Sequence, residues 1–402
     1  MKGLMLLSLL LAASNLFADQ NQTATLQEYL SGYKQKEFRY DKEKNKEESL
    51  KLRDSWIAPL QLQYRYNKSN PYDKKQTAKN ASISLNQPIF RSGGIYYGIQ
   101  YANATQQYNN YTIDVQKRRA IKETIMLLMQ IQQSDLRLKK QKKQVQNSKI
   151  KLDQNKEEYL SGQLESGFLD NAIIQLNIVK QALFDIQSSK EKLVSRFKAM
   201  SDLEYRSTTT PYLANITKEE FLQHNIVLEL YKTAKKRDAY KNDVTVAKYL
   251  PALYLNGSYV QDKTSNPLIT RPSSTTYYNY GFSVMMPLDF NTFRDIQSSK
   301  IDMLKSSVVI EDKKRELVSL YEQVEQNLKN ITQKISLAEQ NYSIYKKLLE
   351  DTTKLFNAGY KTKADVELLQ NSADMAKIDM EIFSIDKQLE LLNLYEYYYE
   401  VQ

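Results

Sequence analysis

The chain has 402 residues, a formal net charge of +10 at pH 7, ten glycines, eight prolines and no cysteine. The lack of cysteine excludes disulfides, thiolate metal sites and a cysteine nucleophile, and a mean hydropathy of −0.61 excludes a helical membrane protein. Few helix breakers among many Lys, Gln, Glu and Leu residues predict long uninterrupted helices.

Residues 1–18 have the pattern of a secretory signal peptide. Lys2 precedes an apolar run at residues 4–11, and the small-residue exit predicts cleavage before Asp19. Leu16 occupies the −3 position, where a small residue is usual. Export from the cytoplasm is therefore expected.

The positive charge raises the alternative of a nucleic-acid-binding coiled coil. Lys139, Lys140, Lys142 and Lys143 alternate with Gln in a helical pattern that also holds acidic residues, which is typical of a solvated helix face. Export would also separate the chain from nucleic acid. We expect no nucleic-acid partner.

The first half of the mature chain, residues 19–206, predicts a strand pair between helices. In each strand apolar and polar residues alternate, which is typical of a strand with one apolar face and one water-exposed face. The predicted elements are a helix at about 23–53, strands at about 55–67 and 79–90, a long helix at about 93–160 and a returning helix at about 165–203.

After a linker at 207–216, the same order recurs in residues 217–402, so the chain contains an internal duplication. In the second long helix, a heptad seam from Leu317 to Phe356 predicts knobs-into-holes packing. The predicted elements are a helix at about 218–248, strands at about 249–261 and 276–288, a long helix at about 291–357 and a returning helix at about 362–399.

Four amphipathic strands cannot close a barrel, and an open sheet edge in lipid leaves backbone groups unpaired at several kcal/mol each. Tyr and Trp gather near the strand ends, which favours a membrane sheet over a soluble one. The chain must therefore pool strands with copies of itself: eight from a dimer, twelve from a trimer or sixteen from a tetramer. The fold class is an α+β membrane protein, a β-barrel that continues into a helical coiled-coil tube about 100 Å long.

The duplicated layout, the proline-ended strand followed by hydrophobic-x-Phe, and the helix tips resemble the TolC family of outer-membrane efflux proteins. The most specific segment is 356–366, which resembles the family's aromatic-x-x-Gly-x5-Asp-Val tip. The resemblance covers essentially the whole mature chain. It implies a homotrimer with a twelve-stranded barrel in outer-membrane lipid, four strands per chain, and a helical barrel in the periplasm. It also implies a periplasmic adaptor (membrane fusion) protein and an inner-membrane pump as partners.

The resemblance places Asp365 in a ring of carboxylates at the periplasmic aperture, with Glu367 beside it. Three such carboxylates would favour cations and could bind a blocking divalent ion. The alternative is that Asp365 is an N-terminal helix residue favoured by the helix dipole. Lys361 occupies the position of a basic gate residue that could form an inter-helix ion pair, or it is an exposed lysine in a turn.

The tip of the first repeat departs from the family pattern, because two more residues separate Gly162 from Asp170 than separate Gly359 from the equivalent Asp. Asp170 is the corresponding aperture candidate. Both glycines are expected to cap helices. With Tyr360, they would also line the groove that an adaptor's helical hairpin enters.

The predicted function is a passive exit duct of a tripartite efflux system for drugs or other small molecules. A duct for type I protein secretion and a periplasmic coiled-coil adaptor or scaffold are the alternatives. His224 is the only histidine, and no Ser-His-Asp set or Gly-rich phosphate loop is present. We therefore expect no enzymatic activity, no cofactor and no resident metal.

Overall fold

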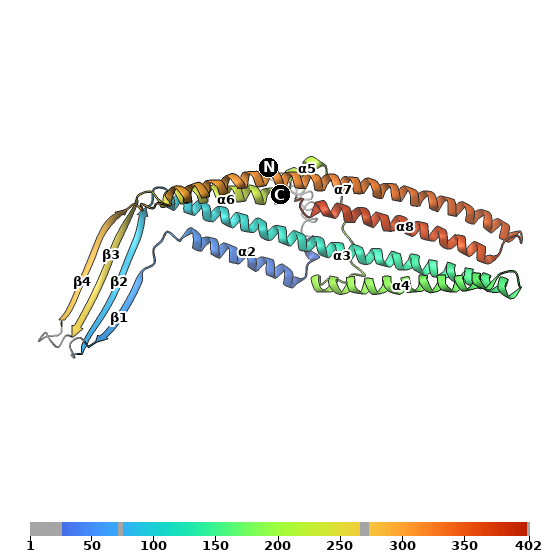
Figure 1. The fold of residues 1–402 in the computed structure, drawn as a ribbon, viewed down its shortest axis with the longest axis horizontal. Coiled ribbons are helices and arrows are strands. Elements are labelled where there is room, and N and C mark those ends of the chain that lie inside the picture. The colour runs from blue at the N-terminus through green and yellow to red at the C-terminus, as the bar shows by residue number, and fades with distance from the viewer. Residues whose placement is uncertain (1–25, 71–74, 266–272, 400–402) are drawn as a thin grey trace, which may run out of the picture. The chain divides into compact units, whose positions relative to one another are not determined.

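The computed structural model describes residues 26–70, 75–265 and 273–399, so the expected signal peptide lies outside the described residues. The elements (Figure 1) are α2 Gly32–Arg53, β1 Gln61–Ser69, β2 Gln76–Phe90, α3 Gly94–Leu160, α4 Ser166–Met200, α5 Lys218–Gln223, α6 Ile226–Lys248, β3 Ala252–Ser265, β4 Ser273–Met285, α7 Thr292–Asn357 and α8 Lys363–Tyr395. The expected α+β fold, with long helices and four antiparallel strands in one chain, is confirmed.

The chain forms two compact units, and each unit draws on both halves of the sequence. Within the described residues, unit 1 contains 26–39, Asp114–Ile226 and 315–399, and unit 2 contains Tyr40–Ile113 and Val227–Lys314. The long helices α3 and α7 contribute residues to both units. Neither compact unit therefore coincides with a sequence repeat.

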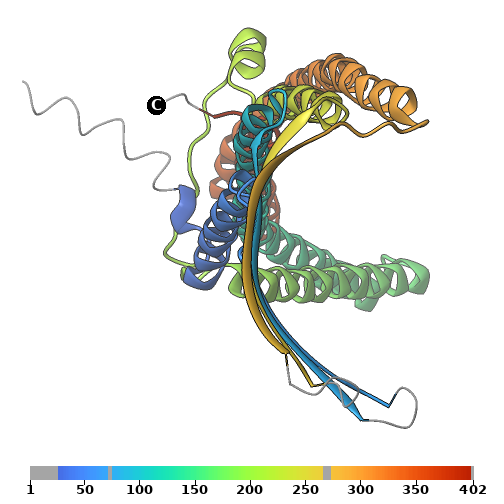
Figure 2. The same cartoon turned by 90° about the vertical axis from the view of Figure 1, so that its left-hand side faces the viewer.

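Unit 2 contains the sheet, whose strands pair antiparallel in the order β1-β2-β3-β4. Figure 2 shows the four strands curving together. The register between β2 and β3 shifts between Pro88 and Phe90. Proline has no N–H to donate to a ladder, so a bulge at this point is expected.

The first strand was predicted to begin at about residue 55, but β1 begins at Gln61. The side chain of Gln87 accepts a hydrogen bond from the Ala58 N–H at 2.9 Å and donates to the Trp56 carbonyl at 3.2 Å. These bonds hold the preceding segment out of the ladder, so its alternating pattern does not become strand.

Two predicted helices are interrupted by long-range hydrogen bonds within unit 1. The predicted helix at 218–248 breaks between α5 and α6, where the Ile226 N–H donates to the Tyr397 carbonyl and the Tyr399 N–H donates to the His224 carbonyl, each at 2.9 Å. The helix predicted at about 23–53 breaks before Gly32, whose N–H donates to Asp202 at 2.7 Å.

The core of unit 1 lies where α3, α4 and α8 meet, and its largest members include Leu128, Phe197 and Leu391, each at most 2% exposed. The seam of α7 is buried at heptad spacing, as knobs-into-holes packing requires. Its buried members are Leu317, Val324, Ile331 and Ala338. None of the helices in the described ranges has a segment both long and apolar enough to span a bilayer.

Candidate functional site

One face of the sheet is mainly apolar, and each of the four strands contributes apolar side chains to it. Residues that pair directly across the sheet form rows, and one such row is Leu62, Ile83, Tyr259 and Tyr278. Further members of this face are Tyr64, Leu85, Leu255, Tyr280, Phe282 and Val284.

Most of these side chains are exposed, with Tyr280 at 83% and Phe282 at 77%, and Leu85 is half-buried. The opposite face is polar, as in the row Gln61, Ser84, Ser258 and Asn279. A sheet with one exposed apolar face and one polar face suits a boundary between lipid and water.

The two edge strands of the sheet are β1 and β4. Each edge presents a row of backbone N–H and C=O groups that no strand of the same chain pairs. In hydrocarbon such groups must find partners, since each unsatisfied group costs several kcal/mol. The sheet is therefore incomplete as a single chain in a membrane.

At the first helix tip, α3 ends in a glycine cap. Gly162 has a φ of 75°, a left-handed conformation that glycine adopts without a Cβ penalty. Its N–H donates to the Tyr159 carbonyl at 3.0 Å, and the Gln163 N–H donates to the Glu158 carbonyl at 2.9 Å. This pair of bonds is a Schellman motif, which satisfies carbonyls at the end of a helix.

The second tip repeats this geometry residue for residue. Gly359 has a φ of 80° and donates to the Phe356 carbonyl at 2.9 Å, while the Tyr360 N–H donates to the Leu355 carbonyl at 2.9 Å. Tyr360 is 80% exposed. Figure 1 shows both turns at the same end of the unit 1 helices, so the duplication extends to the capping bonds of the two tips.

The tips differ where the chain re-enters a helix. At the second tip, Thr362 and Asp365 form a capping box at the start of α8. The bonds from the Thr362 N–H and hydroxyl to Asp365 hold the pKa of that carboxyl below its usual range, and the charge of Lys361 adds to the effect. At the first tip, Glu165 occupies the N-cap position and makes no side-chain capping bond.

The predicted aperture residues fall into two groups. Asp365, Lys361 and Glu367 all lie on the turn or first turns of α8, and Glu367 pairs with Lys363 at 3.7 Å. Asp170 lies inside α4, beyond its first three residues, and is exposed. Asp365 is the third residue of its helix, so the two extra residues at the first tip place Asp170 at a different helical position.

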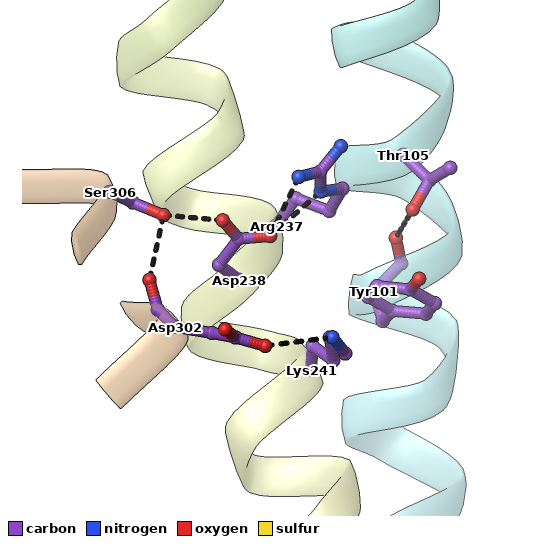
Figure 3. Close-up of polar contacts among 7 residues, drawn as sticks. All are labelled: Tyr101, Thr105, Arg237, Asp238, Lys241, Asp302 and Ser306. Atoms are coloured by element: carbon purple, nitrogen blue, oxygen red, sulfur yellow. Dashed lines mark hydrogen bonds and ion pairs between the residues drawn. The ribbon is translucent and has the colours of Figure 1, made fainter. Parts of the chain in front are cut away.

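A polar network between α6 and α7 in unit 2 was not predicted from the sequence. Ser306 donates a hydrogen bond to Asp238, and Lys241 pairs with Asp302 at 3.2 Å (Figure 3). Residues three or four apart share one helix face, so the spacing on each helix carried a weak signal for this contact.

Arg237 extends the network toward α3. Its guanidinium pairs with Asp238 at 2.8 Å and lies 4.2 Å from the centroid of the Tyr108 ring. The Asp238 side chain is only 14% exposed. Ser306 of α7 bonds to this Arg237–Asp238 pair and the Tyr108 ring of α3 lies against it, so the network links α6 to both helices in unit 2.

His224 serves packing in the structure. Its ring meets Tyr398 and Tyr399 edge-on, with centroids 6.0 and 6.4 Å away. Within the described ranges, no group of three or more His, Asp or Glu side chains is arranged to hold a metal ion.

No protein-family model and no curated protein matches the sequence. Solved structures do match its fold. The outer membrane protein VceC from Vibrio cholerae aligns with a TM-score of 0.72 at 14% identity, covering 94% of this chain and 97% of that one. The CmeC outer membrane channel of Campylobacter jejuni aligns at 0.70 and 12% identity, covering 93% and 84%.

The open state of the MtrE outer membrane channel of Neisseria gonorrhoeae aligns at 0.63 and 10% identity, covering 92% of this chain and 87% of that one. At these identities the likeness is one of fold. The chain therefore has the fold of TolC-type outer-membrane channels over nearly its whole length, and the expected resemblance in fold is confirmed.

Proposed function

We propose that this chain is the outer-membrane exit duct of a tripartite efflux system. The observation that carries the proposal is the sheet, which has one exposed apolar face, one polar face and two unpaired edges within a channel fold. The apolar face contacts outer-membrane lipid, and the polar face lines a water-filled lumen. The helices then lie in the periplasm.

The duct is a homotrimer with a twelve-stranded barrel. Edge strand β1 of one copy pairs with β4 of the next, which satisfies the open edges. An eight-stranded barrel from a dimer is just wide enough for its own side chains to fill. Twelve strands are therefore the smallest multiple of four that leaves an open lumen.

A second apolar seam on α7 supports assembly through the helices. It lies about 120° around the helix from the buried seam, at 100° per residue. Its exposed members, at 43–57% exposure, are Leu337, Ile344, Leu348 and Leu355. Knobs-into-holes packing against a neighbouring protomer would bury this seam.

The helix tips form the periplasmic aperture and the docking site for an adaptor. Asp365 and Lys361 lie beside the Gly359 cap, and the exposed ring of Tyr360 adds an apolar contact. In the trimer, Asp365 contributes one carboxylate from each copy to a ring that binds divalent cations. Asp170 and Glu367 lie further along their helices and contribute negative charge nearby. An adaptor protein and an inner-membrane pump supply the energy, and the duct itself has no enzymatic role.

Drugs or other small molecules are the proposed cargo, and secreted protein is the second candidate. Disrupting the gene should raise the retention of a fluorescent efflux substrate in intact cells, and re-expression should restore export. Normal retention combined with loss of a secreted protein from the medium would instead support type I secretion. Unchanged retention and secretion would contradict the duct.

A further inference from the structure

Three lysines lie on the apolar face of the sheet, beyond a mixed row made by Tyr64, Ala81, Gln261 and Thr276. One row contains Tyr66, Lys79, Lys263 and Ser274, side by side across all four strands. In the next row, Lys68 of β1 pairs with Thr77. All three lysines share the face of Leu62 and Tyr259, because strand residues two apart point to the same side.

The pairing of Lys79 with Lys263 is unfavourable by itself. Directly opposed residues on neighbouring antiparallel strands have Cβ atoms about 5 Å apart, and like charges there repel each other. The ammonium of Lys79 lies 5.8 Å from the centroid of the Tyr66 ring, which is a weak interaction at an exposed site.

The described strands carry no Asp or Glu on this face to compensate the lysines. The nearest acidic residue in the sheet, Asp262, points to the polar face with Arg65 and is bonded to Asn80 at 2.6 Å. The lysine face therefore holds concentrated positive charge without a counter-charge from its own strands.

The lysines lie at one end of the apolar band only. Lys68 is next to the end of β1, and Lys263 is close to the end of β3, where each strand leads into its hairpin. The other end of the band, where Phe90, Leu253 and Val284 form a row, precedes the helices and has no lysine in the strand rows. This asymmetry distinguishes the two sides of a membrane.

We propose that Lys68, Lys79 and Lys263 form a binding site for the phosphate groups of an anionic lipid in the outer leaflet of the outer membrane. The inference rests on the proposed function, which places the hairpin end of the barrel at the cell surface. Acyl chains lie along the apolar rows and the phosphates meet the ammonium groups, with Tyr66 in the same row as Lys79 and Lys263. Lysine binds phosphate as a compact point charge.

The attraction between one lysine and an anionic lipid surface corresponds to about a fivefold change in binding affinity. Removing two lysines should therefore weaken binding about 25-fold. The effect should fall with added salt, because exposed charges are screened.

The test is native mass spectrometry of the detergent-solubilised oligomer titrated with a diphosphorylated glycolipid or with phosphatidylcholine. We expect the wild-type oligomer to prefer the phosphorylated lipid, and Lys79→Gln/Lys263→Gln to lose that preference. Lys79→Arg/Lys263→Arg should retain it. The matched control is Arg65→Gln, which removes a positive charge at a similar height on the polar face and should leave lipid binding unchanged.

Equal binding of the phosphorylated lipid by the wild type and the double variant would overturn the inference. So would equal loss in Arg65→Gln, or binding of inorganic phosphate with no preference for the lipid. The single variant Lys263→Gln, with a loss of about fivefold, decides the question if the double variant does not assemble. A wild-type oligomer that inserts into bilayers yet shows no lipid preference overturns this inference alone, whereas failure to insert contradicts the proposed function.

Discussion

Thr362 and Asp365 hold each other through reciprocal hydrogen bonds at the second helix tip. The Asp365 N–H donates to the Thr362 hydroxyl oxygen at 3.2 Å, and the Thr362 N–H donates to Asp365 Oδ2 at 3.0 Å. The Thr362 hydroxyl also bonds to Oδ2. Among the described hydrogen bonds of this carboxylate, none involves Oδ1, so capping the helix and binding a cation are compatible roles.

Exchanging Asp365 for Asn should separate these two roles. Asn keeps an acceptor for the cap but removes the negative charge, so the divalent-cation concentration that half-blocks the channel should rise about tenfold. Thr362→Ala is the control, because it costs about 1 kcal/mol of capping while keeping the carboxylate. Single-channel recordings of both variants would measure the half-blocking concentration of the divalent cation. Unchanged block in Asp365→Asn would remove this residue from the aperture.

The cap at Asp365 should also depend on pH. Its pKa is lowered in the folded chain, chiefly by the backbone hydrogen bond from Thr362. A lowered folded pKa stabilises the tip fully above the unfolded value of about 3.9, and this contribution disappears as pH falls through the folded pKa. Thermal melts of the wild type and Asp365→Asn should therefore differ at pH 7 and converge in stronger acid. A difference that grows as the pH falls would contradict the assignment.

The two cap glycines should be far more sensitive to a Cβ than a nearby glycine inside a helix. At Gly162 and Gly359 an added Cβ meets nothing within 4 Å, so the cost of Gly→Ala comes from the left-handed backbone and is about 1–2 kcal/mol. Gly167→Ala is the matched control, since Gly167 lies in α4 without positive φ and also has open space. Urea unfolding should show a lower free energy of unfolding for Gly162→Ala and Gly359→Ala, and none of this loss for Gly167→Ala.

The exposed seam of α7 predicts an assembly defect. Ile344→Asp places a charge on a seam that the trimer would bury, so oligomers should dissociate into monomers that keep their helix content. Ser343→Asp adds the same charge at the adjacent residue, on a face about 100° around the helix axis. This control variant should assemble normally. Size-exclusion chromatography with light scattering distinguishes the two. Equal dissociation of both variants would argue against this seam as the interface.

Most of the fold could be predicted from local patterns in the sequence. The alternation in the strands indicated which residues share a face, and the register of β3 with β4 places Tyr259 opposite Tyr278 on the apolar side. The seam of α7 could be read because heptad spacing is a local property, and Val324 and Ile331 in it are buried. The positions of Gly162 and Gly359 at the helix ends followed from the backbone freedom of glycine.

Long-range contacts account for what the sequence did not reveal. The break between α5 and α6 depends on two backbone bonds, one from the Ile226 N–H to the Tyr397 carbonyl and one from the Tyr399 N–H to the His224 carbonyl. No local pattern encodes such pairing. The late start of β1 depends on Gln87 in the next strand. The carboxylate of Asp238 finds its partner on a different helix, at Ser306.

The most direct test of the duct is single-channel recording from the purified oligomer in a planar lipid bilayer, with its adaptor added in a second series. We predict stepwise, cation-selective currents that divalent cations block from one side only. A correctly assembled, membrane-inserted oligomer that carries no current, with or without the adaptor, would contradict the account.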